Sequence, residues 1–193
     1  MMRLKQLWLS ALVLPGVAFG SATETILLSG AGWTADGQPV IVPHTWNADD
    51  GADGPEAERA THKDRRTSLE LIEAYARKSV VYRRALPAPT KGKRQFLRVG
   101  AAATVATVKV NGREVGVHRG PFTAFAYEIT DFLREHDNVL EIVVDNYFDG
   151  KQPPIYADYT VQGGLYRRVS LIETGAVCVD PLRYGGSGLR IWP

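Results

Sequence analysis

Few residues in this 193-residue chain have the types and the spacing that chemistry requires. The densest cluster of carboxylates is DDGADG at Asp49–Gly54, and carboxylate oxygens are the ligands that a hard cation such as calcium prefers. The spacing is not that of an EF-hand, and aspartate–glycine pairs form ordinary turns, so we predict a turn here. Cys178 is the single cysteine, which excludes an internal disulfide and a cysteine-based metal site.

The stretch from Val108 to Asp131 indicates which kind of element must position any functional residue. VKV at Val108–Val110 alternates apolar and polar side chains, and Asn111-Gly112 is a dipeptide that suits a tight hairpin with positive φ. A second turn is expected at Gly120-Pro121. Beyond it, we expect bulky side chains on the buried face of the next strand, at Phe122, Phe125, Tyr127 and Ile129.

Short apolar or alternating runs predict further strands along the chain. They are Thr23–Leu28, Val40–Val42, Val80–Leu86, Phe96–Val99, Val105–Val110, Glu114–Val117, Ala124–Ile129, Val139–Val144 and Arg168–Ile172. We expect a turn-rich link at Gly30–Gly37, a short helix or helical turn within Thr67–Ser79, and one helical turn at Asp131–Leu133. Many short strands at regular spacing predict an all-β sandwich.

Several motifs in a fixed order carry a resemblance to a known family. They are VPHTWN at Val42–Asn47, the strand at Val80–Leu86, DN at Asp145-Asn146 and GGLYRRVSLI at Gly163–Ile172. With the hairpin, they resemble the N-terminal sugar-binding domain of family 2 glycoside hydrolases, which include β-galactosidases, β-glucuronidases and β-mannosidases. The resemblance covers residues 40–193 and implies a jelly-roll, galactose-binding-like β-sandwich.

The same resemblance indicates which part of such an enzyme is missing. Glycoside hydrolysis uses two carboxyl groups, about 5–5.5 Å apart in retaining enzymes. In this family both are glutamates on a (β/α)8 barrel of about 250 residues, and an asparagine precedes the acid/base. None of the four asparagines here, Asn47, Asn111, Asn138 and Asn146, precedes a glutamate. We therefore expect no catalytic residue in this chain and no hydrolysis by it alone.

Two aspartates are the substrate contacts that the resemblance implies. Aligning Gly164–Arg167 with the family's motif places Asp158 on an aspartate that contacts the sugar in β-glucuronidase-type enzymes. Aligning Val144–Gly150 with β-galactosidases places Asp149 on an aspartate that binds the 6-hydroxyl and helps hold a sodium ion, the one cofactor suggested. A turn residue at Asp149 and a surface or capping residue at Asp158 remain open alternatives.

Asn146 completes the expected substrate site, where it would orient the loop of Asp149. Arg77 stands where β-galactosidases place a further sugar-contact asparagine, and this departure argues against a strict lactose-type site. Aromatic residues that could stack on a sugar, or fill the core instead, are His44, Trp46, Tyr156 and Tyr159.

The first 20 residues resemble a signal peptide. Arg3 and Lys5 precede the apolar run Leu7–Val17, and small residues follow at Ala18–Gly20. The full chain has 23 basic and 21 acidic residues, and removal of the leader leaves 21 of each. A near-neutral mature protein has no electrostatic case for binding nucleic acid or an anionic membrane. We expect a periplasmic or secreted protein, which suits a single cysteine.

The expected organisation is a leader at residues 1–20, a sugar-binding sandwich at 21–177, and at 178–193 the start of a truncated immunoglobulin-like domain. The last boundary rests on the motif DPLRYGGSGLRI at Asp180–Ile191, which resembles the family's domain junction. The predicted function is that of the non-catalytic N-terminal domain of an exported, β-galactosidase-like enzyme. Its partners would be a carbohydrate of the β-galactoside or β-glucuronide type and the missing barrel. The alternatives are a self-sufficient carbohydrate-binding module and an interaction domain without sugar binding.

Overall fold

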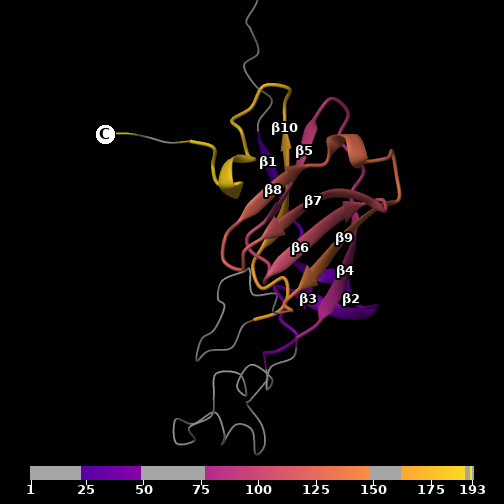
Figure 1. The fold of residues 1–193 in the computed structure, drawn as a ribbon. Helices are drawn as coiled ribbons and strands as arrows, with labels where there is room; N and C mark the ends of the chain where they lie inside the picture. Colours follow the sequence, from indigo (N-terminus) through magenta and orange to yellow (C-terminus); the bar gives the residue numbers. More distant parts are fainter. Residues whose placement is uncertain (1–22, 49–76, 148–161, 190–191, 193) are drawn as a thin grey trace, which may run out of the picture.

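The structure is a computed structural model that describes residues 23–48, 77–147, 162–189 and 192 (Figure 1). The predicted leader and most of the expected helical segment at Thr67–Ser79 lie outside these residues, as does the acidic run Asp49–Gly54. Within the described ranges, no helix has the length and apolar character needed to cross a bilayer.

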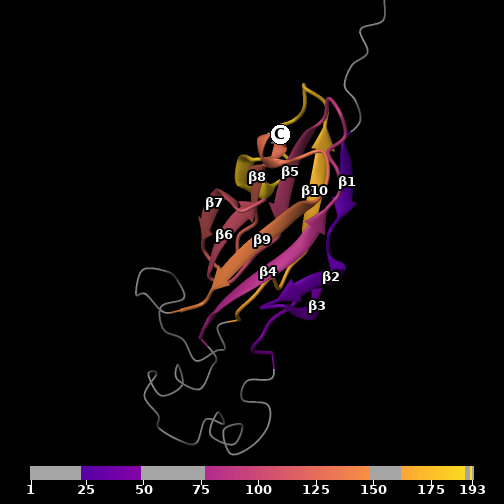
Figure 2. The ribbon, with the colours of Figure 1, turned by 90° about the vertical axis from the view of Figure 1, so that its right-hand side faces the viewer.

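Two antiparallel β-sheets make up the described chain, and they pack face to face (Figures 1 and 2). The first sheet has, in spatial order, β3 (Gln38–Val42), β2 (Gly30–Ala35), β4 (Ser79–Leu86), β9 (Asn138–Asp145), β6 (Val105–Val110) and β7 (Arg113–Arg119). The second has β1 (Glu24–Leu27), β10 (Val169–Thr174), β5 (Arg94–Val99) and β8 (Phe125–Glu128). Two 3-10 turns are η1 (Thr130–Phe132) and η2 (Arg183–Gly185).

The hydrophobic core lies between the two sheets. Along β9 and β6, buried side chains alternate with partly exposed ones, as expected for strands that each cover the core with one face. The largest fully buried apolar or aromatic side chains are Trp33, Tyr82, Phe96, Leu97, Ile129, Leu140, Ile142, Leu165 and Leu171. The predicted all-β sandwich is therefore confirmed.

The hairpin at Asn111-Gly112 is also confirmed. Both residues have positive φ, 53° and 79°, which is the combination that a two-residue type I′ turn requires. The Asn111 side chain fixes the turn further, because its amide nitrogen donates to the Phe132 carbonyl at 2.9 Å and its oxygen accepts from the Val139 N–H at 3.0 Å.

The prediction for Gly30–Gly37 was wrong, because residues 30–35 form strand β2. Trp33 explains the difference: its side chain is 1% exposed, and its indole N–H donates to the Leu28 carbonyl at 2.7 Å. The turn itself is limited to Asp36 and Gly37, whose φ angles are 48° and 84°. A buried indole thus holds in a sheet a glycine-rich stretch that has weak intrinsic strand preference.

The prediction that Phe122 lies on a buried face was also wrong. Strand β8 begins only at Phe125, and Phe122 lies in the loop before it with 57% of its surface exposed. Phe125 and Ile129 are buried as expected, at 6% and 0%, and Tyr127 is half-buried against Gly116.

The segment after β10 folds back against the sandwich, beside β8 (Figure 1). The Arg98 guanidinium donates to the Gly185 carbonyl, and a side chain at Gly185 would lie 2.8 Å from the Phe125 nitrogen. The start of a second domain at residue 178 stays a prediction.

Candidate functional site

Loop segments meet at one end of the sandwich, which we call the loop end. Strands β5 and β9 end there and strands β4 and β10 begin there, since the antiparallel register places Val99 opposite Val169 and Ser79 opposite Asp145. Its described segments are residues 43–47, 77–78, 100–104, 120–124, 145–147 and 162–168.

Asn47 links two sequence motifs that lie far apart in the chain. Its side chain is 1% exposed, and its Oδ1 accepts from the Gly163 N–H at 2.9 Å and from the Thr45 hydroxyl at 2.7 Å. Trp46 adds a backbone bond from its N–H to the Gly163 carbonyl at 3.2 Å. The indole of Trp46 covers Gly163 so closely that a Cβ there would lie 2.2 Å from the ring. The HTWN and GGLY motifs therefore form one unit.

His44 and Tyr82 form a second fixed contact under this unit. The Tyr82 side chain is fully buried, and its hydroxyl lies 2.7 Å from His44 Nδ1. Burial raises the pKa of Tyr82 well above its ordinary value, whereas burial and then the nearby Lys78 charge lower the pKa of His44. At neutral pH the imidazole is therefore uncharged, and the tyrosine hydroxyl can donate to it. The role of His44 is structural in this geometry.

Asn146 is fully buried and lies between the segments at 77–78 and 145–147. Its Oδ1 accepts from the Lys78 N–H at 2.9 Å, and its own N–H donates to the Lys78 carbonyl at 3.3 Å. The Arg77 guanidinium donates through Nη1 to the Asn146 carbonyl at 3.0 Å. Asn146 thus fixes the chain where it enters segment 148–161, and a direct contact with sugar stays a prediction.

Asp149 and Asp158, the two predicted sugar contacts, lie outside the described residues, and so does the sodium ligand expected at Asp149. Among the residues that the structure does describe, no group of three histidine, cysteine, aspartate or glutamate side chains could hold a metal ion. The structure therefore places the frame on both sides of these aspartates, at Asn146 and Gly163, and leaves their roles as predictions.

Arg77 and Lys78, like Arg167 and Arg168, are cations of the loop end that have no acidic partner among the described residues. Arg77 and Lys78 form no ion pair there, and the Lys78 ammonium lies 5.8 Å from the centre of the Trp46 ring. Arg77 Nε is buried and has no hydrogen-bond partner in the part of the chain that the structure describes, and burial lowers the pKa of the Arg77 guanidinium. The sequence singled out Arg77 only because it stands where β-galactosidases have an asparagine. Its position next to Lys78 was the one sequence feature that could have indicated a charged pair here.

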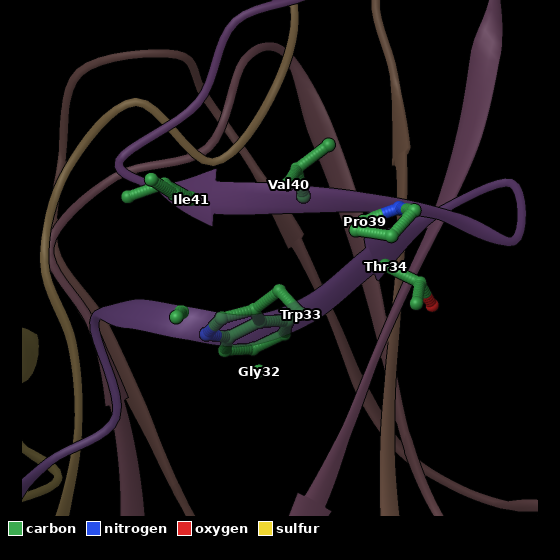
Figure 3. A pocket seen from close by; sticks show the side chains of 7 residues that line it. Gly32, Trp33, Thr34, Pro39, Val40 and Ile41 are labelled. Atoms are coloured by element: carbon green, nitrogen blue, oxygen red, sulfur yellow. The ribbon is translucent and has the colours of Figure 1, made fainter.

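A separate groove of about 470 Å³ lies between β2 and β3 (Figure 3). A register shift between Gly30 and Trp33 separates the two strands locally. Seven residues line it, and none is titratable: Ala31, Gly32, Trp33, Thr34, Pro39, Val40 and Ile41. This groove offers apolar surface and no group for acid–base chemistry.

The fold and the loop end define a class of protein: an antiparallel β-sandwich with its polar frame at one end. Comparison with known proteins gives the family. Residues 58–159 match the family model described as "Glycosyl hydrolase 2 galactose-binding domain-like". The chain belongs to this family of galactose-binding-like domains of glycoside hydrolase family 2.

Relatives support the assignment along most of the chain. A β-glucuronidase of Bacteroides fragilis is 34% identical over 161 residues, which are 81% of this chain and 20% of that protein. A β-galactosidase of Thermoanaerobacter pseudethanolicus is 36% identical over 85 residues, or 42% of this chain and 11% of that protein. The crystal structure of an FMN-binding β-glucuronidase from Facaelibacterium prausnitzii L2-6 has a TM-score of 0.70 and 38% identity, covering 85% of this chain and 24% of that one. This chain thus spans about a fifth or less of the length of these curated relatives.

Proposed function

We propose that this chain acts as the non-catalytic N-terminal domain of an exported family 2 glycoside hydrolase and completes its substrate pocket at the loop end. The observation that supports this proposal most directly is the set of hydrogen bonds on both sides of segment 148–161. Asn146 accepts from the Lys78 N–H before that segment, and Asn47 accepts from the Gly163 N–H after it. The relatives named as β-glucuronidases and β-galactosidases support a β-glucuronide or β-galactoside as the sugar. We also propose that the β-sandwich has a jelly-roll topology.

A rigid frame suits a supporting role because it places side chains without a large entropic cost on binding. We assign the sugar contacts to Asp158 and Asp149, whose carboxylate oxygens accept hydrogen bonds from hydroxyl groups. In open water such a bond gains little, because solvent offers the same partner. Enclosed by a barrel, its loss would cost about 1.5–3 kcal/mol. The domain would therefore contribute to substrate binding only within the whole enzyme.

The test joins this chain to the remaining domains of the Bacteroides fragilis β-glucuronidase in place of that enzyme's matching N-terminal region. We expect the fusion to hydrolyse an aryl β-glucuronide, whereas the purified chain alone gives no turnover. In the fusion, Asp158→Ala should lower kcat/KM at least tenfold and leave the melting temperature unchanged. Glu135→Ala, which removes an exposed carboxylate at the other end of the sandwich, is the matched control. Unchanged kinetics of Asp158→Ala would contradict the pocket-completing role.

One observation favours a second candidate, a self-sufficient carbohydrate-binding module. Phe122 and Tyr147 are 57% and 56% exposed at the loop end, and exposed aromatic rings can stack on sugars. Titration of the isolated chain with neutral oligosaccharides decides between the two. Saturable binding that Phe122→Ala or Tyr147→Ala abolishes would support the module.

Export is tested separately, on protein recovered from the native host. Cleavage of the proposed leader should give a mature N-terminus between Ser21 and Thr23. N-terminal sequencing that finds Met1 on abundant soluble protein would contradict export.

A further inference from the structure

The side of the six-stranded sheet that is turned away from the core presents residues of four neighbouring strands, β4, β9, β6 and β7 (Figure 2). Tyr82, Ile142 and Val108 occupy one register row across three of these strands and are fully buried. The residues one position along each strand therefore point away from the core. We call the outward residues of these four strands the outer face.

The outer face has three neighbouring rows that run straight across the sheet. In the order β4, β9, β6 and β7, the charged row is Arg83, Glu141, Lys109 and Glu114, the apolar row is Val81, Val143, Thr107 and Val117, and the third row is Ser79, Asp145, Val105 and Arg119. Three outward valines in one row depart from the polar outer face of a solvated antiparallel sheet, and Val117 is 40% exposed. Contiguous apolar surface between polar rows is typical of an interaction site.

The charged row alternates in sign from β4 to β7. Glu141 accepts from Arg83 Nε at 2.8 Å and lies 3.6 Å from the Lys109 ammonium, so the central charges are paired within the chain. The Arg83 side chain is 51% exposed, and Glu114 is exposed as well. Three strand spacings separate these two residues, about 14 Å, so they do not pair with each other. The row thus has an accessible positive charge on β4 and an accessible negative charge on β7.

This pattern of charges is complementary to itself. A two-fold axis that is parallel to the strands and lies between β9 and β6 places β4 of one copy opposite β7 of the other, and β9 opposite β6. Arg83 then faces Glu114 of the second copy, and Glu141 faces Lys109 of the second copy. In the third row, Arg119 lies diagonally across from Asp145 of the second copy. The apolar row faces the apolar row of the second copy, so Val81 meets Val117.

The orientation of the second copy follows from the same charges. A two-fold axis across the strands, through the apolar row, would place the charged row opposite the third row. Glu141 would then face Asp145 of the second copy, and two like charges brought together in an interface are unfavourable. Only the axis parallel to the strands joins opposite charges in both polar rows.

We propose that the outer face is the interface of a symmetric dimer of this chain, with its two-fold axis parallel to the strands. The proposal concerns assembly and is independent of any sugar contact at the loop end. Four strands about 4.8 Å apart and three rows about 6.8 Å apart give a flat footprint of about 400 Å² on each copy. Such an area is at the low end of specific interfaces, so we expect a weak dimer with a dissociation constant on the order of 0.1–1 mM.

The test measures the molecular mass of the purified chain in solution, by sedimentation and small-angle scattering, between about 0.05 and 1 mM. The wild type should change from monomer to dimer over this range. Arg83→Glu and Glu114→Arg should each weaken the dimer at least tenfold, because each introduces two like-charge contacts that the symmetry repeats. Val117→Lys should weaken it too. Glu135→Arg, an exposed change at the other end of the sandwich, is the matched control and should have no effect.

The double variant Arg83→Glu/Glu114→Arg decides the orientation. It exchanges the two charges that face each other across the proposed interface, and should restore the affinity of the wild type to within threefold. Within one copy the two sites are about 14 Å apart, so restoration cannot come from a contact inside the chain. Melting temperatures check that every variant is folded. A chain that stays monomeric at about 1 mM, a dimer that is insensitive to Arg83→Glu, or a double variant that is not restored would each overturn the proposal.

Discussion

We call the end of the sandwich opposite the loop end the hairpin end. The two ends differ in the hydrogen-bond partners of their buried polar groups. At the hairpin end, the buried carboxylate of Glu173 accepts from the Thr90 hydroxyl at 2.9 Å and from Gln95 Nε2 at 2.6 Å. Nearby, Arg94 holds Glu128 through two bonds of 2.9 and 2.7 Å. Here these two acidic groups find their partners within the domain, although Gln95 Oε1 has none among the described residues.

At the loop end, the buried groups are neutral and bond chiefly to backbone. Asn47 and Asn146 take backbone N–H groups, and the positive charges of Arg77 and Lys78 meet no described carboxylate. The two ends therefore differ in kind: the described contacts at the hairpin end include charged side-chain pairs, whereas those at the loop end join neutral side chains to the backbone. The predictions below test this difference, from the largest expected effect to the smallest.

The largest effect should come from a glycine at the loop end. Gly164 has a φ of 129°, and a Cβ there would lie 2.5 Å from the His44 carbonyl oxygen and 2.7 Å from the Tyr82 hydroxyl. Gly164→Ala should therefore lower the free energy of unfolding by about 3 kcal/mol or more. At the hairpin end, Gly112 also has positive φ but nothing within 4 Å, so Gly112→Ala should cost about 1 kcal/mol. Urea denaturation measures both, and equal losses would contradict the tight packing at Gly164.

Removal of a charged group should lower the stability of the fold at the hairpin end but not at the loop end. Glu173→Ala leaves the fully buried Gln95 amide without its acceptor, and should cost about 2 kcal/mol of stability. Lys78→Gln keeps the backbone bonds to Asn146, and should change stability by no more than about 0.5 kcal/mol. Thermal unfolding of both variants measures the difference. A destabilised Lys78→Gln would show that the loop end depends on its charge for folding.

Mild acid should weaken the loop end through His44. Because burial lowers the pKa of His44 in the folded state below its ordinary 6.5, the unfolded chain binds the proton more readily. This contribution to stability is complete above pH 6.5 and falls as the pH drops toward the folded-state pKa. The melting temperature should decrease by a few degrees over that window, and less in His44→Gln. Burial also lowers the pKa of His118, so the share of His44 is the difference in slope between the wild type and His44→Gln, and His118→Gln gives the other share.

The smallest effect should come from the ion pair at the hairpin end. The side chains of Arg94 and Glu128 are 38% and 34% exposed, so solvent screens their attraction. The hydrogen bond from Arg94 lowers the pKa of Glu128, and the pair therefore stabilises the fold above the ordinary glutamate pKa and loses that effect as acid protonates Glu128. Glu128→Gln should cost less than about 1 kcal/mol at neutral pH, and the difference from wild type should vanish in acid. A difference that persists in acid would assign the effect to packing.

The sequence by itself determined the features that depend on neighbouring residues. Asn111-Gly112 adopts its positive φ angles because the local backbone preferences of these residues allow them, and alternation along Asn138–Asp145 follows from the two-residue period of a strand. The same local patterns, repeated many times, were enough to predict an all-β sandwich. The ordered motifs were enough to indicate the family, which the family model then matched at residues 58–159.

The tertiary structure decided the features that depend on contacts between distant residues. Residues 30–35 form strand β2 because the Trp33 side chain is buried in the core. Phe122 is exposed because strand β8 begins only at Phe125, which leaves Phe122 in the preceding loop. Asn47 bonds to Gly163, 116 positions away, and Arg77 bonds to Asn146, 69 positions away. No local propensity encodes such a pairing, because its energy exists only when folding brings both partners to the same end of the sandwich. The frame of the loop end became visible for that reason only in the folded chain.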